Sequence, residues 1–194
     1  MFKLNSMVAG AVLAFSGFAA QAEDWTLDAE ASQIAFGSVK SNEIGEVHTF
    51  KEFSGSASDG GAVGIEINLA SVETLIDIRN ERMIEFVFQN APTARISAQI
   101  DMEEVNGLGV GESTVIIADG VVSLVGNEIE LDGDLFVMRL SEDKVLVSTD
   151  GMIMMNIEDA GLTAGIDKLK EIAGLDVITR VSPVTLRLIF DRAS

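Results

Sequence analysis

Apolar and polar residues alternate with a period of two through much of this chain, and that alternation limits the fold more than any other feature. In residues 63–69 the odd positions are Val, Ile, Ile and Leu, whereas small or polar residues fall between them. The even positions of residues 184–190 repeat the pattern with Val, Leu, Leu and Phe. Because successive side chains of a strand point to opposite faces, this alternation predicts half-buried β-strands.

Short turn signals separate these segments. Gly adopts positive φ without steric cost, and a neighbouring Asp or Asn favours a tight hairpin. Such signals occur at Asp59-Gly60-Gly61, Asn106-Gly107, Asp119-Gly120, Gly126-Asn127, Asp132-Gly133 and Asp150-Gly151. The strands predicted from turns and alternation are residues 25–38, 46–56, 62–71, 93–102, 112–125, 127–139, 143–157 and 177–191. Eight strands with short connections predict an all-β antiparallel barrel or a sandwich, and a barrel of about eight strands has room for one ligand.

Two segments have helical spacing instead. Residues 78–89 are predicted as a short helix that ends before Pro92. Apolar residues at 162, 166, 169 and 172 predict a second helix over 161–173, with Gly174 as its C-terminal stop. We expect this second helix to cover one end of the core, and a lid over an opening is the alternative.

The first residues have the features of a cleavable signal peptide. Lys3 is followed by an uncharged apolar run over residues 7–18, and Ala20-Gln21-Ala22 fits the small-x-small cleavage rule. The run is shorter than the roughly 20 residues that span a bilayer, and no later stretch is long and apolar enough to do so. We therefore expect residues 1–22 to be a signal peptide, residues 23–194 to form one domain, and the mature protein to reside in the periplasm without stable membrane insertion.

Charge and composition exclude several classes of function. A formal net charge of −18 repels nucleic acid and anionic lipid surfaces. The chain has no Cys, which excludes thiol nucleophiles, thiolate metal sites and disulfides. A core made from 47% hydrophobic residues must hold the fold alone.

The inventory of catalytic side chains is thin. His48 is the only histidine, tyrosine is absent, and no nucleophile-elbow motif lies near His48. We interpret His48 as an ordinary hydrogen-bonded strand residue. The glycines of residues 107–111 do not open a helix, so they are interpreted as a connection rather than a phosphate loop. We expect no enzyme activity, no metal and no cofactor.

Aromatic and flexible apolar side chains are more plentiful. Met adapts its shape to irregular ligands, although it also fills gaps in a packed core. Periodicity alone does not distinguish a filled barrel from a hollow one. If the barrel is hollow, the expected ligand-binding residues are Phe36, Phe50, Phe53, Ile65, Ile67, Leu69, Arg79, Arg82, Met83, Phe86, Leu135, Val137, Met152 and Met154.

Several local motifs together resemble a known family. They are Trp25-Thr26-Leu27-Asp28, Ser32-Gln33-Ile34-Ala35-Phe36, Val47-His48-Thr49-Phe50-Lys51-Glu52-Phe53-Ser54-Gly55, Ile67-Asn68-Leu69-Ala70-Ser71-Val72-Glu73-Thr74, Arg79-Asn80-Glu81-Arg82-Met83, Pro92-Thr93-Ala94 and Pro183-Val184-Thr185-Leu186. In this combination the chain resembles the YceI-like proteins, although His48-Thr49 stands where that family's strand commonly has Gly. The resemblance implies an eight-stranded lipocalin-like barrel in the periplasm, with a long apolar channel for a polyisoprenoid or a similar amphiphile.

The leading hypothesis is therefore a periplasmic protein that sequesters or carries an isoprenoid, a quinone or another amphiphilic lipid. A structural or protein-interaction module with a filled barrel is the alternative, and a hydrolase is the third. The candidates for contact with a charged headgroup are Lys40, Lys51, Arg79 and Arg82, unless Arg79 and Arg82 pair with Asp77 and Glu81. A strand edge left open by incomplete closure would permit a homodimer.

Overall fold

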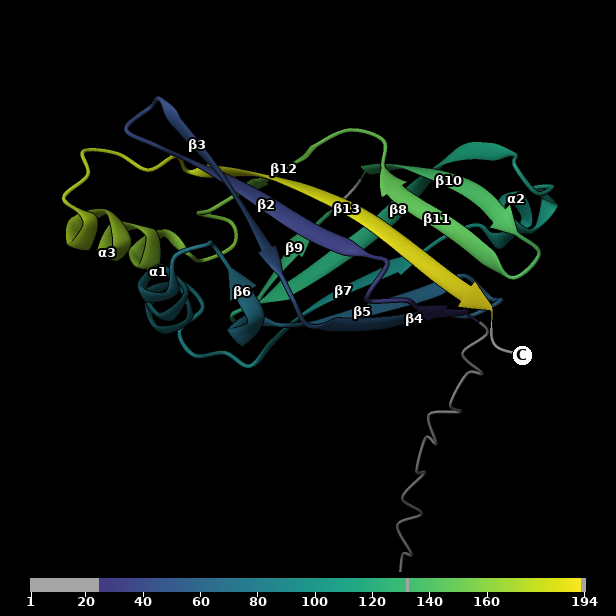
Figure 1. Ribbon diagram of the computed structural model, residues 1–194, viewed down its shortest axis with the longest axis horizontal. Coiled ribbons are helices and arrows are strands. Elements are labelled where there is room, and N and C mark those ends of the chain that lie inside the picture. Colours follow the sequence, from purple (N-terminus) through teal and green to yellow (C-terminus); the bar gives the residue numbers. More distant parts are fainter. Residues whose placement is uncertain (1–24, 132, 193–194) are drawn as a thin grey trace, which may run out of the picture.

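The computed structural model describes residues 25–131 and 133–192, which form one antiparallel sheet with three α-helices (Figure 1). The predicted signal peptide lies outside the described residues. The strands are β1 (Trp25–Leu27), β2 (Gln33–Lys40), β3 (Ile44–Phe50), β4 (Phe53–Ala57), β5 (Ala62–Asn68), β6 (Val72–Glu73), β7 (Thr93–Gln99), β8 (Ser113–Leu124), β9 (Asn127–Glu130), β10 (Gly133–Ser141), β11 (Lys144–Thr149), β12 (Ile153–Asn156) and β13 (Val181–Arg192). The helices are α1 (Asp77–Arg82), α2 (Met102–Gly107) and α3 (Thr163–Ala173), with a 3₁₀ turn η1 (Leu69–Ser71) and a π-helical turn η2 (Met83–Val87).

Eight strands close into a barrel. Their order is β1, β4, β5, β7, β8, β10, β11 and β13, and β13 then pairs with β1 through Leu27 opposite Phe190. Every pairing in this ring is antiparallel. At its other end β13 also pairs with β2 and β12, and β2 continues into β3 and β6. The predicted antiparallel barrel is confirmed, and the sandwich is excluded.

Two of the predicted turns were wrong. Asp119 and Gly120 lie inside β8, where Gly120 is opposite Ala98. A Cβ atom at Gly120 would lie 3.0 Å from the carbonyl oxygen of Leu131, so Gly is required by close backbone approach rather than by a turn. Asn106-Gly107 is not a turn but the end of helix α2, which the sequence did not predict. The helix has an N-cap, because the Asp101 carboxylate accepts a hydrogen bond from the Glu103 N–H at 2.8 Å.

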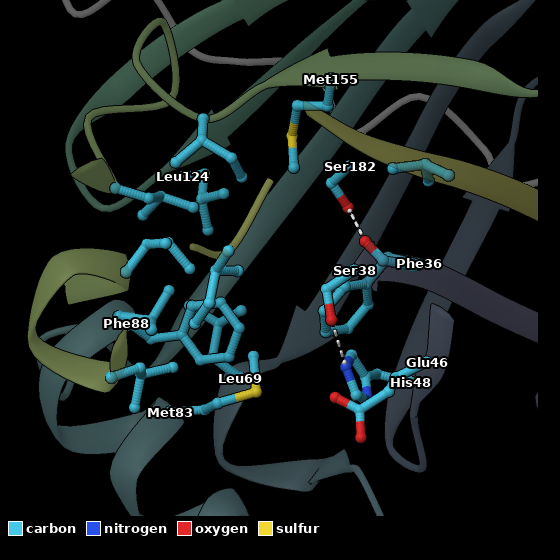
Figure 2. A pocket seen from close by; sticks show the side chains of 18 of the residues that line it. Phe36, Ser38, Glu46, His48, Leu69, Met83, Phe88, Leu124, Met155 and Ser182 are labelled. Carbon is cyan, nitrogen blue, oxygen red and sulfur yellow. Dashed lines mark hydrogen bonds between the residues drawn. The ribbon is translucent and has the colours of Figure 1, made fainter. Parts of the chain in front are cut away.

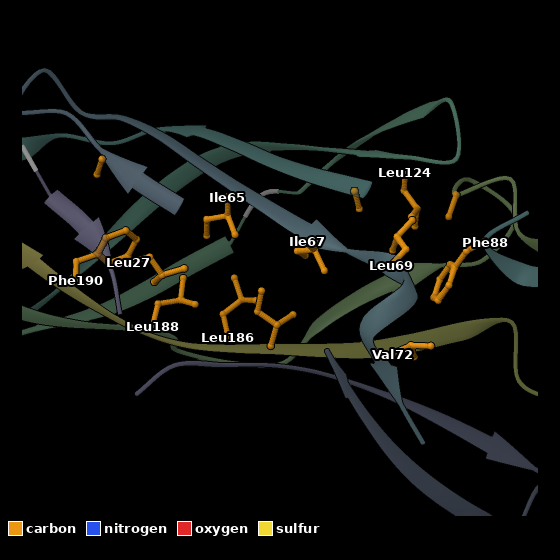
Figure 3. Packing of buried hydrophobic residues seen from close by; sticks show 14 of the residues in the cluster. Leu27, Ile65, Ile67, Leu69, Val72, Phe88, Leu124, Leu186, Leu188 and Phe190 are labelled. Atoms are coloured by element: carbon orange, nitrogen blue, oxygen red, sulfur yellow. The ribbon is translucent and has the colours of Figure 1, made fainter. Parts of the chain in front are cut away.

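One end of the barrel is filled with side chains. Its packed core contains Leu27, Ile65, Leu188 and Phe190 (Figure 3). Val137 is buried in the same cluster. Helix α2 lies at this end, away from α1 and α3 (Figure 1).

A buried cation helps to seal the filled end. The Arg139 guanidinium donates a hydrogen bond to the Val105 carbonyl of α2 at 2.9 Å and lies 5.3 Å from the ring centre of Trp25. Trp25 is 1% exposed and Arg139 is 5% exposed. Both groups are therefore shielded from water at the filled end.

The two predicted helices lie together at the other end of the barrel (Figure 1). The predicted 78–89 helix is α1 followed by η2, and the predicted 161–173 helix is α3. Gly165 of α3 packs directly on the backbone of η2, since a Cβ atom there would lie 2.3 Å from the carbonyl oxygen of Phe86. In residues 25–131 and 133–192 no helix is both long enough and apolar enough to cross a membrane.

Candidate functional site

The barrel is hollow between its filled end and the helices. The cavity there has a volume of about 410 Å³, which falls within the roughly 300–1,000 Å³ of small-molecule sites. Residues of β2, β3, β5, β7, β8, α1, η2, α3 and β13 contribute to its wall. On β5 the filled and hollow regions meet, because Ile65 and Ile67 are both buried in the core but only Ile67 lines the cavity.

The walls contributed by β2 and β3 change from apolar to polar along the strands. Alternate residues face inward, so Phe36 and Phe50 line the apolar part and Ser38 and His48 line the polar part. The rings form a continuous row, with centroid distances of 5.9 Å from Phe88 to Phe50, 5.4 Å from Phe50 to Phe36 and 5.2 Å from Phe36 to His48. The cavity is therefore amphipathic along its length.

Glu46 is the charged centre of the polar part. Its Oε1 atom accepts hydrogen bonds from Lys40 Nζ at 2.8 Å and from Arg79 Nη1 at 2.6 Å. Partial burial raises the pKa of Glu46, but the hydrogen bonds and charges of Lys40 and Arg79 outweigh it and hold that pKa below 4.5. Arg79 Nη2 also donates to the Thr74 carbonyl at 2.5 Å, so this guanidinium is held from two sides.

His48 lies beside this ion pair and is 3% exposed (Figure 2). Its Nε2 atom is 3.1 Å from the Ser38 hydroxyl, whereas its buried Nδ1 atom has no hydrogen-bond partner. Burial lowers the pKa of His48 below 6.5, and the nearby Arg79 charge lowers it further. Burial therefore favours the neutral form of the ring. Within the described residues no group of three or more acidic or histidine side chains is arranged to hold a metal ion.

Helix α3 covers the apolar part of the cavity. Leu162, which precedes it, and Ile166 and Leu169 of the helix line the wall, as do Leu69 and Phe88. What the helix covers is a cavity rather than packed side chains, so its expected role of covering one end of the core and the alternative of a lid both stay predictions.

Seven of the fourteen predicted site residues line the cavity: Phe36, Phe50, Ile67, Leu69, Arg79, Arg82 and Met83. Ile65 and Val137 lie in the filled end, and Phe53 and Leu135 pack against the core outside the cavity. Phe86 also lies outside the wall, with its carbonyl against Gly165. Met152 and Met154 are 68% and 59% exposed, and Met155 reaches the cavity instead.

The predicted basic candidates have different surroundings. Arg79 does pair internally, but with Glu46 rather than with Asp77 or Glu81. Lys40 shares that partner, and Lys51 pairs with Glu73 away from the cavity. Arg82 lines the cavity and forms no ion pair with any described residue.

The polar lining was missed from the sequence. Glu46 and His48 share an inward face with Phe50, and the same period of two that predicts the strand would have placed them inside. Met155 gave no comparable signal, because residues 152–155 are apolar throughout and do not define a register.

Solved structures show where this architecture occurs elsewhere. A polyisoprenoid binding domain from Saccharophagus degradans, implicated in plant cell wall breakdown, is similar with a TM-score of 0.86 and 33% sequence identity, over 89% of this chain and 100% of that one. BcnA from Burkholderia cenocepacia has a TM-score of 0.64 at 14% identity, over 84% of this chain and 98% of that one.

The Campylobacter jejuni YCEI protein has a TM-score of 0.51 at 12% identity, over 76% of this chain and 85% of that one. At 14% and 12% identity, these two likenesses show a shared fold. No family model matches the chain, and no curated protein sequence matches it.

Proposed function

The chain belongs to the YceI-like family of lipocalin-like barrels, and from that premise we propose that it binds a long-chain amphiphilic lipid, such as an isoprenoid or a quinone, and is not an enzyme. The observation that carries the proposal is the cavity of about 410 Å³, which has apolar walls and one polar end. An amphiphile has the same division. The 33% identical relative that is a polyisoprenoid binding domain supports this class of ligand.

Burial of the apolar chain supplies the affinity. Each CH₂ group removed from water contributes about 0.8 kcal/mol. A chain of about a dozen carbons then provides roughly 10 kcal/mol before an association cost of at least about 4 kcal/mol, so binding near micromolar concentration requires a chain of about fifteen carbons or more. The filled-barrel alternative is supported only for the end that contains Val137 and Leu188.

Blocking the cavity tests the proposal. Ile67→Trp puts a large ring into the empty space, so it should weaken binding of a fluorescent fatty chain at least tenfold while the free energy of unfolding changes little. Ile65→Trp is the matched control on the same strand, because it overpacks the filled end and should destabilise by about 1–3 kcal/mol. Urea unfolding and fluorescence titration measure the two effects.

Extraction of the purified protein with organic solvent, followed by mass spectrometry, identifies any lipid that it carries. Undiminished binding by Ile67→Trp, together with no extracted lipid, would refute the proposed function.

We further propose that the protein works in the periplasm as a carrier or a store of its ligand. This rests on residues 1–22, which have the composition of a signal peptide. Intact-mass measurement of the exported protein should give an N-terminus at Glu23. Recovery of a periplasmic form that retains Met1 would contradict cleavage at that site.

A further inference from the structure

The connection between β6 and α1 holds a bulky side chain in a backbone conformation that such residues rarely adopt (Figure 1). Leu75 has a φ of 64°, in the left-handed region where a Cβ atom is unfavourable. Among the described residues the other apolar residue with positive φ is Val125, which packs against the core, so burial offsets its strain. A strained residue without such compensation points to a function at its position.

Burial does not account for Leu75. Its side chain is 87% exposed, more than any other large apolar residue in residues 25–131 and 133–192. It belongs neither to the core nor to the wall of the cavity. Because an apolar side chain gains free energy when it leaves water, the folded protein alone obtains nothing from a leucine at this position.

Hydrogen bonds hold the strained turn from beneath. The Leu75 N–H donates to Glu73 Oε1 at 2.6 Å. Thr74 is buried, and its N–H and its hydroxyl both donate to Asn80 Oδ1, at 2.8 Å and 2.6 Å. The Thr74 carbonyl accepts from Arg79. The backbone on both sides of the leucine is therefore fixed, and the side chain stays in solvent.

The exposed leucine lies beside an opening of the cavity. Ile76 and Ile78 follow it in the chain and both line the cavity, although 46% and 49% of their surfaces are exposed. Side chains that belong both to the cavity wall and to the outer surface mark a place where the apolar interior reaches solvent. Leu75, Ile76 and Ile78, here called the apolar tip, form one exposed surface that continues into the cavity.

Composition and charge indicate what covers the apolar tip. Its apolar side chains are all aliphatic, whereas protein–protein interfaces are enriched in aromatic residues, Met and Arg. Binding to a lipid surface requires only apolar area that can enter the boundary between headgroups and acyl chains. The net charge of −18, with Asp77 inside the tip, opposes binding to anionic lipids. A bilayer with net-neutral headgroups is the surface that fits both observations.

We propose that the apolar tip docks on a net-neutral lipid bilayer, so that the opening beside Ile76 and Ile78 faces the membrane that supplies or receives the ligand. The inference rests on the proposed lipid-binding function and adds the surface on which the protein exchanges its ligand. Leu75 serves as the membrane anchor and does not contact the bound chain.

Flotation of the mature protein with vesicles tests the docking. The wild type should bind vesicles of dioleoylphosphatidylcholine and should bind less well to an equimolar mixture with dioleoylphosphatidylglycerol. Leu75→Asn removes the apolar side chain and accepts the left-handed conformation. It should lower vesicle binding about tenfold or more, as the loss of one inserted leucine implies. It should also raise the urea midpoint of unfolding, because the strain is relieved.

A matched control and a second measurement accompany this variant. Ile117 on β8 is 73% exposed and does not line the cavity, so Ile117→Asn removes a comparable side chain outside the tip and should leave vesicle binding unchanged. Extraction of a pyrene-labelled fatty alcohol from phosphatidylcholine vesicles should be slower for Leu75→Asn. Binding of the same alcohol from solution should not change, because Leu75 lies outside the cavity wall.

The outcomes separate membrane docking from lipid binding itself. Docking through the tip is overturned by equal vesicle binding of the wild type and Leu75→Asn, by an equal loss in Ile117→Asn, by stronger binding to the anionic vesicles, or by a lower urea midpoint of Leu75→Asn. A wild type that binds no vesicles also overturns it and leaves a protein partner as the occupant of the tip. Failure to bind the fatty alcohol from solution would instead count against the proposed lipid-binding function.

Discussion

At the scale of single residues, His48 links the cavity to the pH dependence of stability. Its pKa lies below 6.5 in the folded protein because the ring is buried, with the charges of Arg79 and Lys40 adding to the effect of burial and Glu46 opposing it. The unfolded chain therefore binds a proton more readily than the folded one. Stability that is fully present above pH 6.5 is lost as pH falls below that value.

This pH dependence predicts that the stability of the wild type and that of His48→Phe respond differently to acid. Between about pH 7.5 and about pH 5.5 the free energy of unfolding of the wild type should fall, whereas that of His48→Phe should stay nearly constant. Urea unfolding at both pH values measures the difference. Glu46 does not affect this comparison, because the stability that its lowered pKa provides is lost only below pH 4.5. Parallel losses in the two proteins would show that His48 does not titrate in this way.

Single residues also show how far the sequence predicts the site. Alternation identified the inward face of residues 63–69, and Ile67 and Leu69 do line the cavity. The interaction of Arg79 with Glu46 was missed, because their distance depends on how α1 packs against β3 and not on local pattern. Binding by any of the predicted residues stays a prediction until a ligand is measured.

At the scale of elements, the cover of the cavity depends on one glycine. Helix propensity alone predicts that Gly165→Ala in α3 stabilises the protein by about 1 kcal/mol. The added Cβ would lie 2.3 Å from the carbonyl oxygen of Phe86 and 2.6 Å from Val87 Cα, both of them backbone atoms. We therefore expect α3 to move away from η2, with a loss of roughly 1–3 kcal/mol and faster ligand release.

Ala164→Gly is the matched control for this prediction. Ala164 is exposed on the same helix, so the change weakens helix propensity without a steric conflict. It should lower stability by about 1 kcal/mol and leave the rate of ligand release unchanged. Stopped-flow dye release measures that rate, and a stabilised Gly165→Ala protein with normal release would contradict close packing at this position.

Elements with a strong period were predicted well, and short ones were not. Helix α3 repeats its apolar residues over three turns and lies within two residues of its predicted bounds. Helix α2 has only six residues, too few to establish a period. The predicted strand over residues 46–56 is two strands, because β3 pairs with β2 outside the ring and β4 belongs to it.

At the scale of the whole molecule, the barrel has a filled end and a hollow end that should respond differently to the same truncation. Leu188 and Leu186 lie two residues apart on β13 and both face inward, but only Leu186 lines the cavity. Leu188→Ala should cost about 2–5 kcal/mol, because it opens a void in packed surroundings. Leu186→Ala enlarges an existing space, so it should cost less and should change ligand affinity. Equal costs, with affinity unchanged in both, would show that the two ends are packed alike.

Alternation identified which side of each strand faces inward, but it carries no information about how much of the interior is occupied. The volume of the cavity depends on side chains from segments as distant as β2, η2, α3 and β13. Periodicity therefore does not distinguish a filled barrel from a hollow one, and each description fits one end of the molecule.

The seam between β1 and β13 has a consequence for the order of events during folding. It joins Trp25 to Arg192, at opposite limits of the described residues, so closure requires a contact of very high sequence separation. Such contacts form slowly, because the entropy of a long loop is lost before they contribute. Since β13 also supplies Val184 and Leu186 to the cavity wall, the binding space does not exist until this strand has docked. We therefore expect loading with lipid to follow folding, and the emission of Trp25, the only tryptophan, should report the closure of the seam.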